Sequence, residues 1–169
     1  MVISFTVKGE PCGKGRPRFA RCITKNGKEY TKTHTPKETA DYEKLIQIEY
    51  LSQVGSIRFT KDTLLKATVK AYFRIPKTTP NWQKPYMEQG IIRPLKKPDW
   101  DNIGKIVTDA LNEFAFHDDV QFIEGAVEKF YSNDPRIEIY LTELPYVSNK
   151  LTRKQMETWL KMKEVELYG

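Results

Sequence analysis

Hydrophobic and polar residues alternate in two stretches of the chain, and each stretch predicts a β-strand. Near the N-terminus, Ile3, Phe5 and Val7 are separated by polar residues. The clearest alternation covers residues 65–74, where every second position is apolar and the positions between are mostly charged or polar. This second strand is therefore expected to place one face on the core and the other in water.

Apolar residues at helical spacing predict three helices. The strongest pattern falls on one helical face and consists of Ile103, Ile106, Val107, Ala110, Leu111 and Phe114. An earlier helix should start at Thr35-Pro36-Lys37-Glu38, with Thr35 as N-cap and Glu38 as capping-box partner, and run to about residue 52. Residues 152–155 predict the capping box of a last helix that carries Met156, Trp159 and Leu160.

The remaining segments complete an α+β fold. Residues 122–131 and 136–142 are predicted to form an antiparallel pair of strands that turns at residues 133–135. The proline-rich residues 76–98 show no periodicity, and a loop of this length is usually functional or mobile. We expect a single domain with a mixed β-sheet, in the order strand, helix, strand, loop, helix, strand, strand. This domain spans residues 1–145, and residues 146–169 form a C-terminal helical extension packed on it or at a dimer interface.

Composition narrows the class of protein. The chain has 169 residues, of which 39% are hydrophobic and 30% charged, as in a single soluble domain. No more than three apolar residues occur in a row, so neither a transmembrane helix nor a signal peptide is expected. Two cysteines are too few for a disulfide framework. We expect a cytoplasmic protein that does not contact membranes.

Positive charge is concentrated at the N-terminal end of the chain. Residues 1–37 hold nine Lys and Arg residues and two Glu residues, a net charge of +7. The whole chain has a net charge of +6, so the remaining residues sum to about −1. This distribution favours a polyanionic partner, nucleic acid first, although a solvated basic face is the plainer interpretation. Within it, Lys14-Gly15-Arg16-Pro17-Arg18-Phe19 could bind phosphates and stack on a base. The segment does not match a nucleotide-binding P-loop.

Acidic residues cluster later in the chain. Five aspartates fall within residues 99–119, namely Asp99, Asp101, Asp109, Asp118 and Asp119. Asp99 and Asp101 flank Trp100 at a predicted helix start, where one could be the N-cap and the other could complement the helix dipole. Only one can cap, and two close carboxylates favour a cation between them. Oxygen ligands of this kind suit Mg²⁺ or Mn²⁺.

Two further features fit a metal site but also have plain explanations. Lys105 lies one helical turn after Asp101, so it could form an ion pair with it or meet charge that develops on a phosphate. His117-Asp118-Asp119 could be a polar turn or could supply ligands. A basic segment that holds a polyanion and aspartates that hold divalent ions together predict phosphodiester hydrolysis.

These residues resemble a known family. Pro98-Asp99-Trp100-Asp101-Asn102, followed by Lys105, Asp109-Ala110-Leu111, Asp118-Asp119 and Gln121, is similar to the signature of RusA-type Holliday junction resolvases. Residues 14–19 resemble the N-terminal motif of that family, and the likeness covers roughly residues 2–142. Such resolvases are small, homodimeric, Mg²⁺-dependent endonucleases of recombination and repair, often carried by phages and prophages. They introduce paired nicks across four-way DNA junctions.

The resemblance implies roles for individual residues. Asp99, Asp101 and Asp119 are expected to hold Mg²⁺, for which Mn²⁺ could substitute, with Asp118 as a fourth acidic member and Lys105 assisting at the scissile phosphate. Trp100 replaces the aliphatic residue common in the family, which affects substrate fit more than chemistry. We expect the DNA contacts to come from Lys14, Arg16, Arg18, Lys96 and Lys97.

Several alternatives stay open from the sequence. The predicted helix rises roughly 16 Å, which seven extended residues could just retrace, so Asp119 could join Asp101 in its own chain or in a partner chain. The expected dimer interface includes Trp82, Tyr86, Met156, Trp159 and Leu160. A non-catalytic nucleic-acid-binding accessory protein is the main alternative function, and a nucleotide-handling enzyme is a weaker one.

Overall fold

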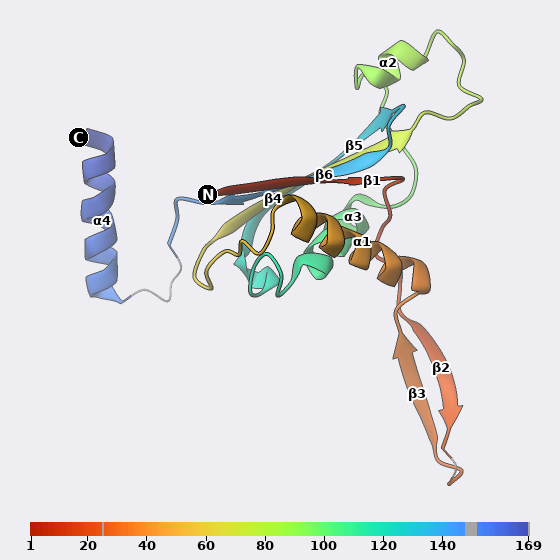
Figure 1. The fold of residues 1–169 in the computed structure, drawn as a ribbon, viewed down its shortest axis with the longest axis horizontal. Coiled ribbons are helices and arrows are strands. Elements are labelled where there is room, and N and C mark those ends of the chain that lie inside the picture. The colour runs from red at the N-terminus through yellow and green to blue at the C-terminus, as the bar shows by residue number, and fades with distance from the viewer. Residues whose placement is uncertain (25, 148–151, 169) are drawn as a thin grey trace.

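The computed structural model describes residues 1–24, 26–147 and 152–168 (Figure 1). Its elements are β1 (Val2–Lys8), β2 (Arg18–Ile23), β3 (Glu29–His34), α1 (Lys37–Gln53), β4 (Leu65–Arg74), α2 (Lys84–Glu88), α3 (Trp100–Leu111), a 3₁₀ turn (Asp119–Gln121), β5 (Phe122–Ser132), β6 (Arg136–Glu143) and α4 (Arg153–Tyr168). The predicted α+β class with a mixed sheet is confirmed. No described helix is both long enough and apolar enough to cross a bilayer.

Four strands form the main sheet in the order β1-β6-β4-β5. β4 pairs in parallel with β5 and antiparallel with β6, so it lies between them. The prediction that residues 122–131 and 136–142 pair with each other is therefore wrong. The chain between β4 and β5 contains α3 and acts as a crossover connection, which is what a parallel pair of strands requires. This crossover places β5 on one edge of β4, and β6 takes the other edge.

Helices α1 and α3 cover one face of this sheet (Figure 1). The core lies between the two layers, and the predicted apolar positions of β1 and of residues 103–111 are buried there. Phe114 is an exception, because α3 ends at Leu111 and Phe114 is 37% exposed. Glu113, at φ 64°, turns the chain out of the helical direction, so the predicted apolar stripe ends one turn early.

The start of α1 differs from the prediction. The N-cap position is Pro36, and no side chain caps the helix, so the expected pairing of Thr35 with Glu38 is absent. Thr39 is buried instead, and its hydroxyl accepts a hydrogen bond from the backbone N–H of Gly15. A contact with a distant segment therefore takes the place of a local cap. The predicted extent of the helix, to about residue 52, agrees with the structure.

Residues 76–98 are less irregular than predicted. They contain the short helix α2, whose Met87 is buried. Arg93 donates a hydrogen bond of 2.9 Å to the carbonyl of Lys129, and its guanidinium lies 3.6 Å from the ring centre of Phe130. These contacts fix part of the segment to β5. Trp82 remains 67% exposed, as expected of an interface residue, but no partner tests that prediction.

The structure adds a β-hairpin that the sequence analysis missed. β2 and β3 pair only with each other and project away from the main sheet (Figure 1). At the other end of the chain, the capping box of α4 is confirmed, since the Oε1 atom of Gln155 accepts hydrogen bonds from the backbone and hydroxyl of Thr152. Residues 148–151 lie outside the described residues, so the packing of the extension 146–169 stays a prediction.

Candidate functional site

The basic motif, residues 13–19, lies directly against the first turn of α3. The backbone N–H of Lys14 donates a hydrogen bond of 2.8 Å to the carbonyl of Asn102. A Cβ atom on Gly13 would come within 2.5 Å of the Cβ atom of Pro98, which is closer than such atoms approach in proteins. Glycine at position 13 therefore allows the motif to contact the residues that begin the helix.

The same motif is held on its other side by α1. The backbone N–H of Gly15 lies 3.1 Å from the hydroxyl of Thr39, and a Cβ atom on Gly15 would lie 2.7 Å from that oxygen. Thr39 is buried, so this hydrogen bond is protected from water. The motif is thus fixed between the two helices before it reaches its arginines.

Lys14 is bound inside the protein. Its Nζ atom lies 2.5 Å from a carboxylate oxygen of Glu43 on α1 and 2.6 Å from one of Asp109 on α3. Burial lowers the pKa of Lys14, but hydrogen bonds to Asp109 and Glu43 outweigh it and leave the pKa above its usual value. Lys14 therefore links the two helices in this structure, whereas the sequence analysis assigned it to phosphate.

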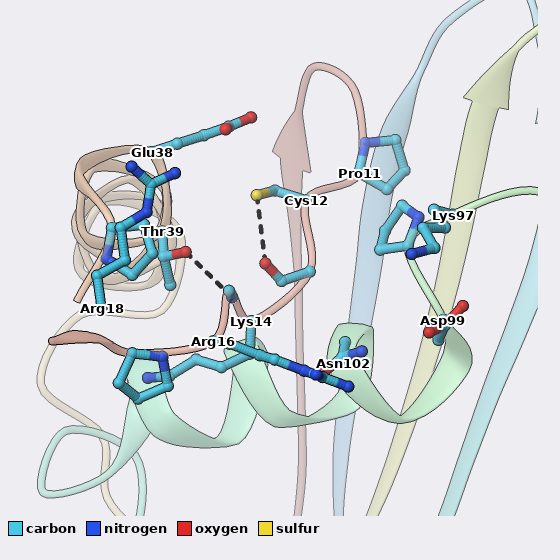
Figure 2. A pocket seen from close by; sticks show the side chains of 15 residues that line it. Pro11, Cys12, Lys14, Arg16, Arg18, Glu38, Thr39, Lys97, Asp99 and Asn102 are labelled. Atoms are coloured by element: carbon cyan, nitrogen blue, oxygen red, sulfur yellow. Dashed lines mark hydrogen bonds between the residues drawn. The ribbon is translucent and has the colours of Figure 1, made fainter.

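A groove of about 880 Å³ opens in front of this motif (Figure 2). Three exposed cations line it, namely Arg16, Arg18 and Lys97, together with Lys14 and the carboxylates of Asp99 and Glu38. In Figure 2, Arg16 extends along the first turn of α3 toward Asn102. Lys96 is directed elsewhere, because its Nζ atom lies 4.8 Å from the ring centre of Phe73. Four of the five predicted DNA contacts therefore line one groove, although the ammonium of Lys14 is paired with Glu43 and Asp109.

Two structural roles considered for these residues, helix capping by Asp99 and an ion pair of Lys105 with Asp101, are not found in the described part of the chain. Asp99 occupies the N-cap position of α3, but its side chain accepts no capping hydrogen bond. Asp101 follows in the first turn, and both carboxylates are exposed. Lys105 is also exposed, and no ion pair between it and Asp101 occurs among the described residues. All three side chains are thus available to a ligand.

Asp118 and Asp119 belong to the turn that precedes β5. The Oδ1 atom of Asp118 accepts a hydrogen bond of 3.2 Å from the N–H of Val120. The turn is fixed from below by the buried Gln121, which donates 2.9 Å hydrogen bonds to the carbonyls of Thr60 and Thr63. The interpretation of residues 117–119 as a polar turn is therefore correct, and Asp118 shares one oxygen with that turn.

The pKa of Asp119 is raised above its usual value. The cause is a hydrogen bond with Asp118, followed by slight burial and by the negative charges of Asp118 and Asp109. Asp109 itself lies on α3, eight residues, or about 12 Å of helix rise, after Asp101. The four predicted ligands thus form one pair at the start of α3, Asp99 and Asp101, and one pair in the turn before β5, Asp118 and Asp119.

The chemistry of these side chains fits a hard divalent cation, since each pair offers carboxylate oxygens. Within the part of the chain that the structure describes, however, no three His, Cys, Asp or Glu side chains are arranged to hold an ion. The donor types therefore fit a metal, while their arrangement in a single chain does not enclose one.

Several residues of this site were not assigned by the sequence analysis. Asp109 was part of the acidic cluster and of the family signature, so its importance could have been inferred from its position two turns after Asp101. Glu43 and Thr39 gave no signal, because only the packing of α1 on the motif brings them there.

Comparison with known proteins agrees with the resemblance of these motifs. Residues 8–142 match the family model described as "Endodeoxyribonuclease RusA". The chain is also similar to a protein of Bacillus subtilis (strain 168) described as "Uncharacterized protein YqaN". The two are 36% identical over 148 residues, which cover 84% of this chain and 96% of that protein. The matched region contains the groove, both aspartate pairs and the projecting hairpin.

Proposed function

This chain belongs to the RusA endodeoxyribonuclease family, and from that premise we propose that it resolves four-way DNA junctions by paired, Mg²⁺-dependent nicks. One observation carries the proposal beyond the family match. Arg16, Arg18 and Lys97 line a single open groove together with the carboxylates of Asp99 and Glu38. A surface that only binds DNA would gain nothing from a carboxylate among its cations, since like charge repels the phosphates. A site that hydrolyses a phosphodiester needs both.

The side chains of the groove have separate tasks in this proposal. Arg16 and Lys97 bind phosphates on either side of the scissile bond and orient it over the first turn of α3. Lys105, which is exposed on that helix, stabilises the negative charge that develops on the phosphate. Lys14 keeps the motif in register with the helix, through its backbone at Asn102 and its ammonium at Asp109.

Asp99, Asp101 and Asp119, with Asp118 as a fourth acidic member, are proposed to hold Mg²⁺, or Mn²⁺ in its place. Such an ion would lower the pKa of a bound water and relieve charge on the leaving oxygen. Asp99 and Asp101 lie at the start of α3, whereas Asp118 and Asp119 lie in the turn before β5, and the sequence analysis allowed for a contribution of Asp119 from a partner subunit.

We further propose that the protein acts as a homodimer. A four-way junction is close to two-fold symmetric, and two symmetry-related nicks require two sites in matching orientation. Trp82 and Tyr86 are exposed apolar side chains of the kind that such an interface buries. Light scattering should give twice the chain mass, whereas a monomer both alone and on DNA would contradict paired cleavage.

A synthetic four-way junction tests the proposed activity. The protein is incubated with the junction or with a duplex of the same sequence, with Mg²⁺ or with EDTA, and the nicked strands are mapped. We expect nicks in two opposing strands of the junction only, and only with Mg²⁺. Tight binding without any nicking in Mg²⁺ or Mn²⁺ would instead favour a non-catalytic DNA-binding protein.

A further inference from the structure

The β2–β3 hairpin contributes nothing to the core of the domain. Its strands pair from Arg18 with His34 to Ile23 with Glu29, and neither strand joins the main sheet. No described side chain of the two strands is buried. An isolated two-stranded hairpin is only marginally stable in water, so this segment is suited to an external partner.

One face of the hairpin carries two large apolar side chains that are exposed to water. Side chains alternate between the two faces of a strand, so Phe19, Arg21 and Ile23 share a face. Their partners on β3, which lie on the same face, are polar: Thr33, Thr31 and Glu29. Phe19 is 73% exposed and Ile23 is 69% exposed. This face therefore offers a partner two exposed apolar side chains with the cation of Arg21 between them.

The charge of the hairpin decides what kind of partner fits it. Residues 18–34 include five Lys and Arg residues and one Glu, a net charge of +4. A second copy of the same hairpin would bring the same positive charge and be repelled. A polyanion is attracted, and its bound counterions are released on contact.

The position of the hairpin relates it to the candidate site. It continues directly from the motif that lines the groove, and Arg18 belongs to both. Six residues of antiparallel strand extend about 20 Å. A two-stranded β-ribbon fits the major groove of B-DNA, which is about 12 Å wide. At 3.4 Å per base pair, the hairpin reaches about six base pairs along a duplex.

We propose that the β2–β3 hairpin lies in the major groove of one duplex arm of the DNA, up to about six base pairs from the cleaved phosphate. Arg21 and Lys28 contact the phosphates that border the groove, and Phe19 contacts apolar base edges within it. This inference rests on the proposed function for the identity of the ligand. It assigns a role in substrate binding to a segment that lies outside the groove of the candidate site.

The test compares the intact protein with the double variant Arg21→Ala, Lys28→Ala. Affinity is measured in EDTA, so that cleavage plays no part, on junctions with arms of about 20 base pairs or of about 4, less than the proposed reach. Lys61→Ala with Lys154→Ala is the matched control, because it removes the same charge from exposed positions outside the hairpin and the groove. Hydroxyl-radical footprinting on the long arms provides a second readout.

On long arms, the hairpin variant should bind about five- to tenfold more weakly, and its salt dependence should be shallower by about two in logarithmic slope. On short arms it should match the intact protein. The footprint should lose its protection about six base pairs from the junction centre. The control variant should leave the footprint unchanged.

Equal loss of affinity on long and short arms, or an unchanged footprint, would overturn the inference. A variant that becomes monomeric in light scattering would also overturn it, because the hairpin would then be a subunit contact. Nicking by the intact protein in Mg²⁺ is scored separately. If nicking is absent but affinity still depends on the hairpin and on arm length, the proposed function fails and the inference about the hairpin stands.

Discussion

The basic N-terminal segment contains two regions that are both positively charged but have different surroundings. Residues 11–17 are fixed between α1 and α3 by hydrogen bonds and by close glycine contacts. Residues 18–34 project into solvent and pair only with themselves. The first region forms one wall of the groove, whereas the second is free to contact a ligand. A run of positive charge in a sequence can therefore contain both a structural part and a binding part.

If the fixed region serves the chemistry, the largest effect should come from the carboxylates beside it. Asp101→Asn should lower the nicking rate by about 10²–10³-fold, because it removes a charge proposed to hold the metal. Junction affinity should stay equal or rise, since the change adds positive charge to the DNA-binding face. Single-turnover nicking and gel-shift affinity measure the two effects.

The control for this variant is Asp134→Asn, which removes the same charge from an exposed turn where the backbone makes the recorded contacts. It should cleave as fast as the intact protein. Nicking by Asp101→Asn at a similar rate would show that this helix start does not supply the catalytic carboxylates.

The two regions should also differ in their tolerance of a methyl group. Gly13→Ala places a Cβ atom against Pro98 and should lower the free energy of unfolding by about 1–3 kcal/mol. Gly27→Ala, in the hairpin turn at φ 75°, meets no atom within 4 Å and strains only the turn. Urea unfolding followed by tryptophan fluorescence should therefore shift for the first variant and not for the second. Equal shifts would mean that the hairpin is coupled to the core.

Replacing one lysine in each region should also change the free energy of unfolding differently, by a smaller amount than the glycine variants. Lys14→Met leaves Glu43 and Asp109 without their shared partner and should lower the free energy of unfolding by about 1–2 kcal/mol, reduced from a fully buried pair by partial exposure. Lys28→Met in the hairpin should change it by less than about 0.5 kcal/mol. If Lys14 mainly binds DNA, its replacement should weaken binding and leave the unfolding midpoint unchanged.

The boundary between the regions should give the smallest effect. Arg16→Ala with Arg18→Ala should weaken binding to junction and duplex alike by about fivefold and reduce the salt slope by about two, because phosphate contacts carry no sequence information. Titrations at several salt concentrations measure both quantities. An unchanged slope would mean that these arginines do not contact DNA and that the basic segment is only a surface exposed to solvent.

Regular patterns made much of this fold predictable. The alternation of residues 65–74 and the helical spacing of residues 103–111 each arise from one buried face, so a single sequence is enough to recognise them. The hairpin could also have been predicted, because Asn26-Gly27 is a typical two-residue turn signal between strand-forming residues. It was missed because neither strand has a buried face, and hence neither has a hydrophobic period.

The contacts of the site were predictable only in part. Asp99, Asp101 and Lys105 stand out by their spacing, and the structure leaves all three exposed, with Asp99 in the lining of the groove. That Lys14 binds Glu43 and Asp109 could not be inferred, since it depends on how α1 packs across α3. The pairing of β5 with β4 was not predicted either, because it also joins segments that are far apart in the sequence. The turn at residues 133–135 is typical of a hairpin, but β4 lies between the two strands that it joins, and β4 comes from much earlier in the chain.

The central place of β4 has a consequence for the order of folding. Since β5 and β6 flank β4, the short link between them spans two strand spacings, about 9.6 Å, and cannot form by zipping up a local hairpin. In the finished sheet β4 separates the two arms of this link, and β1, from the opposite end of the sequence, pairs with the outer edge of β6. Pairings between such distant segments close large loops before they gain contacts, which slows folding relative to a domain held by local contacts. We therefore expect the sheet to form cooperatively around β4.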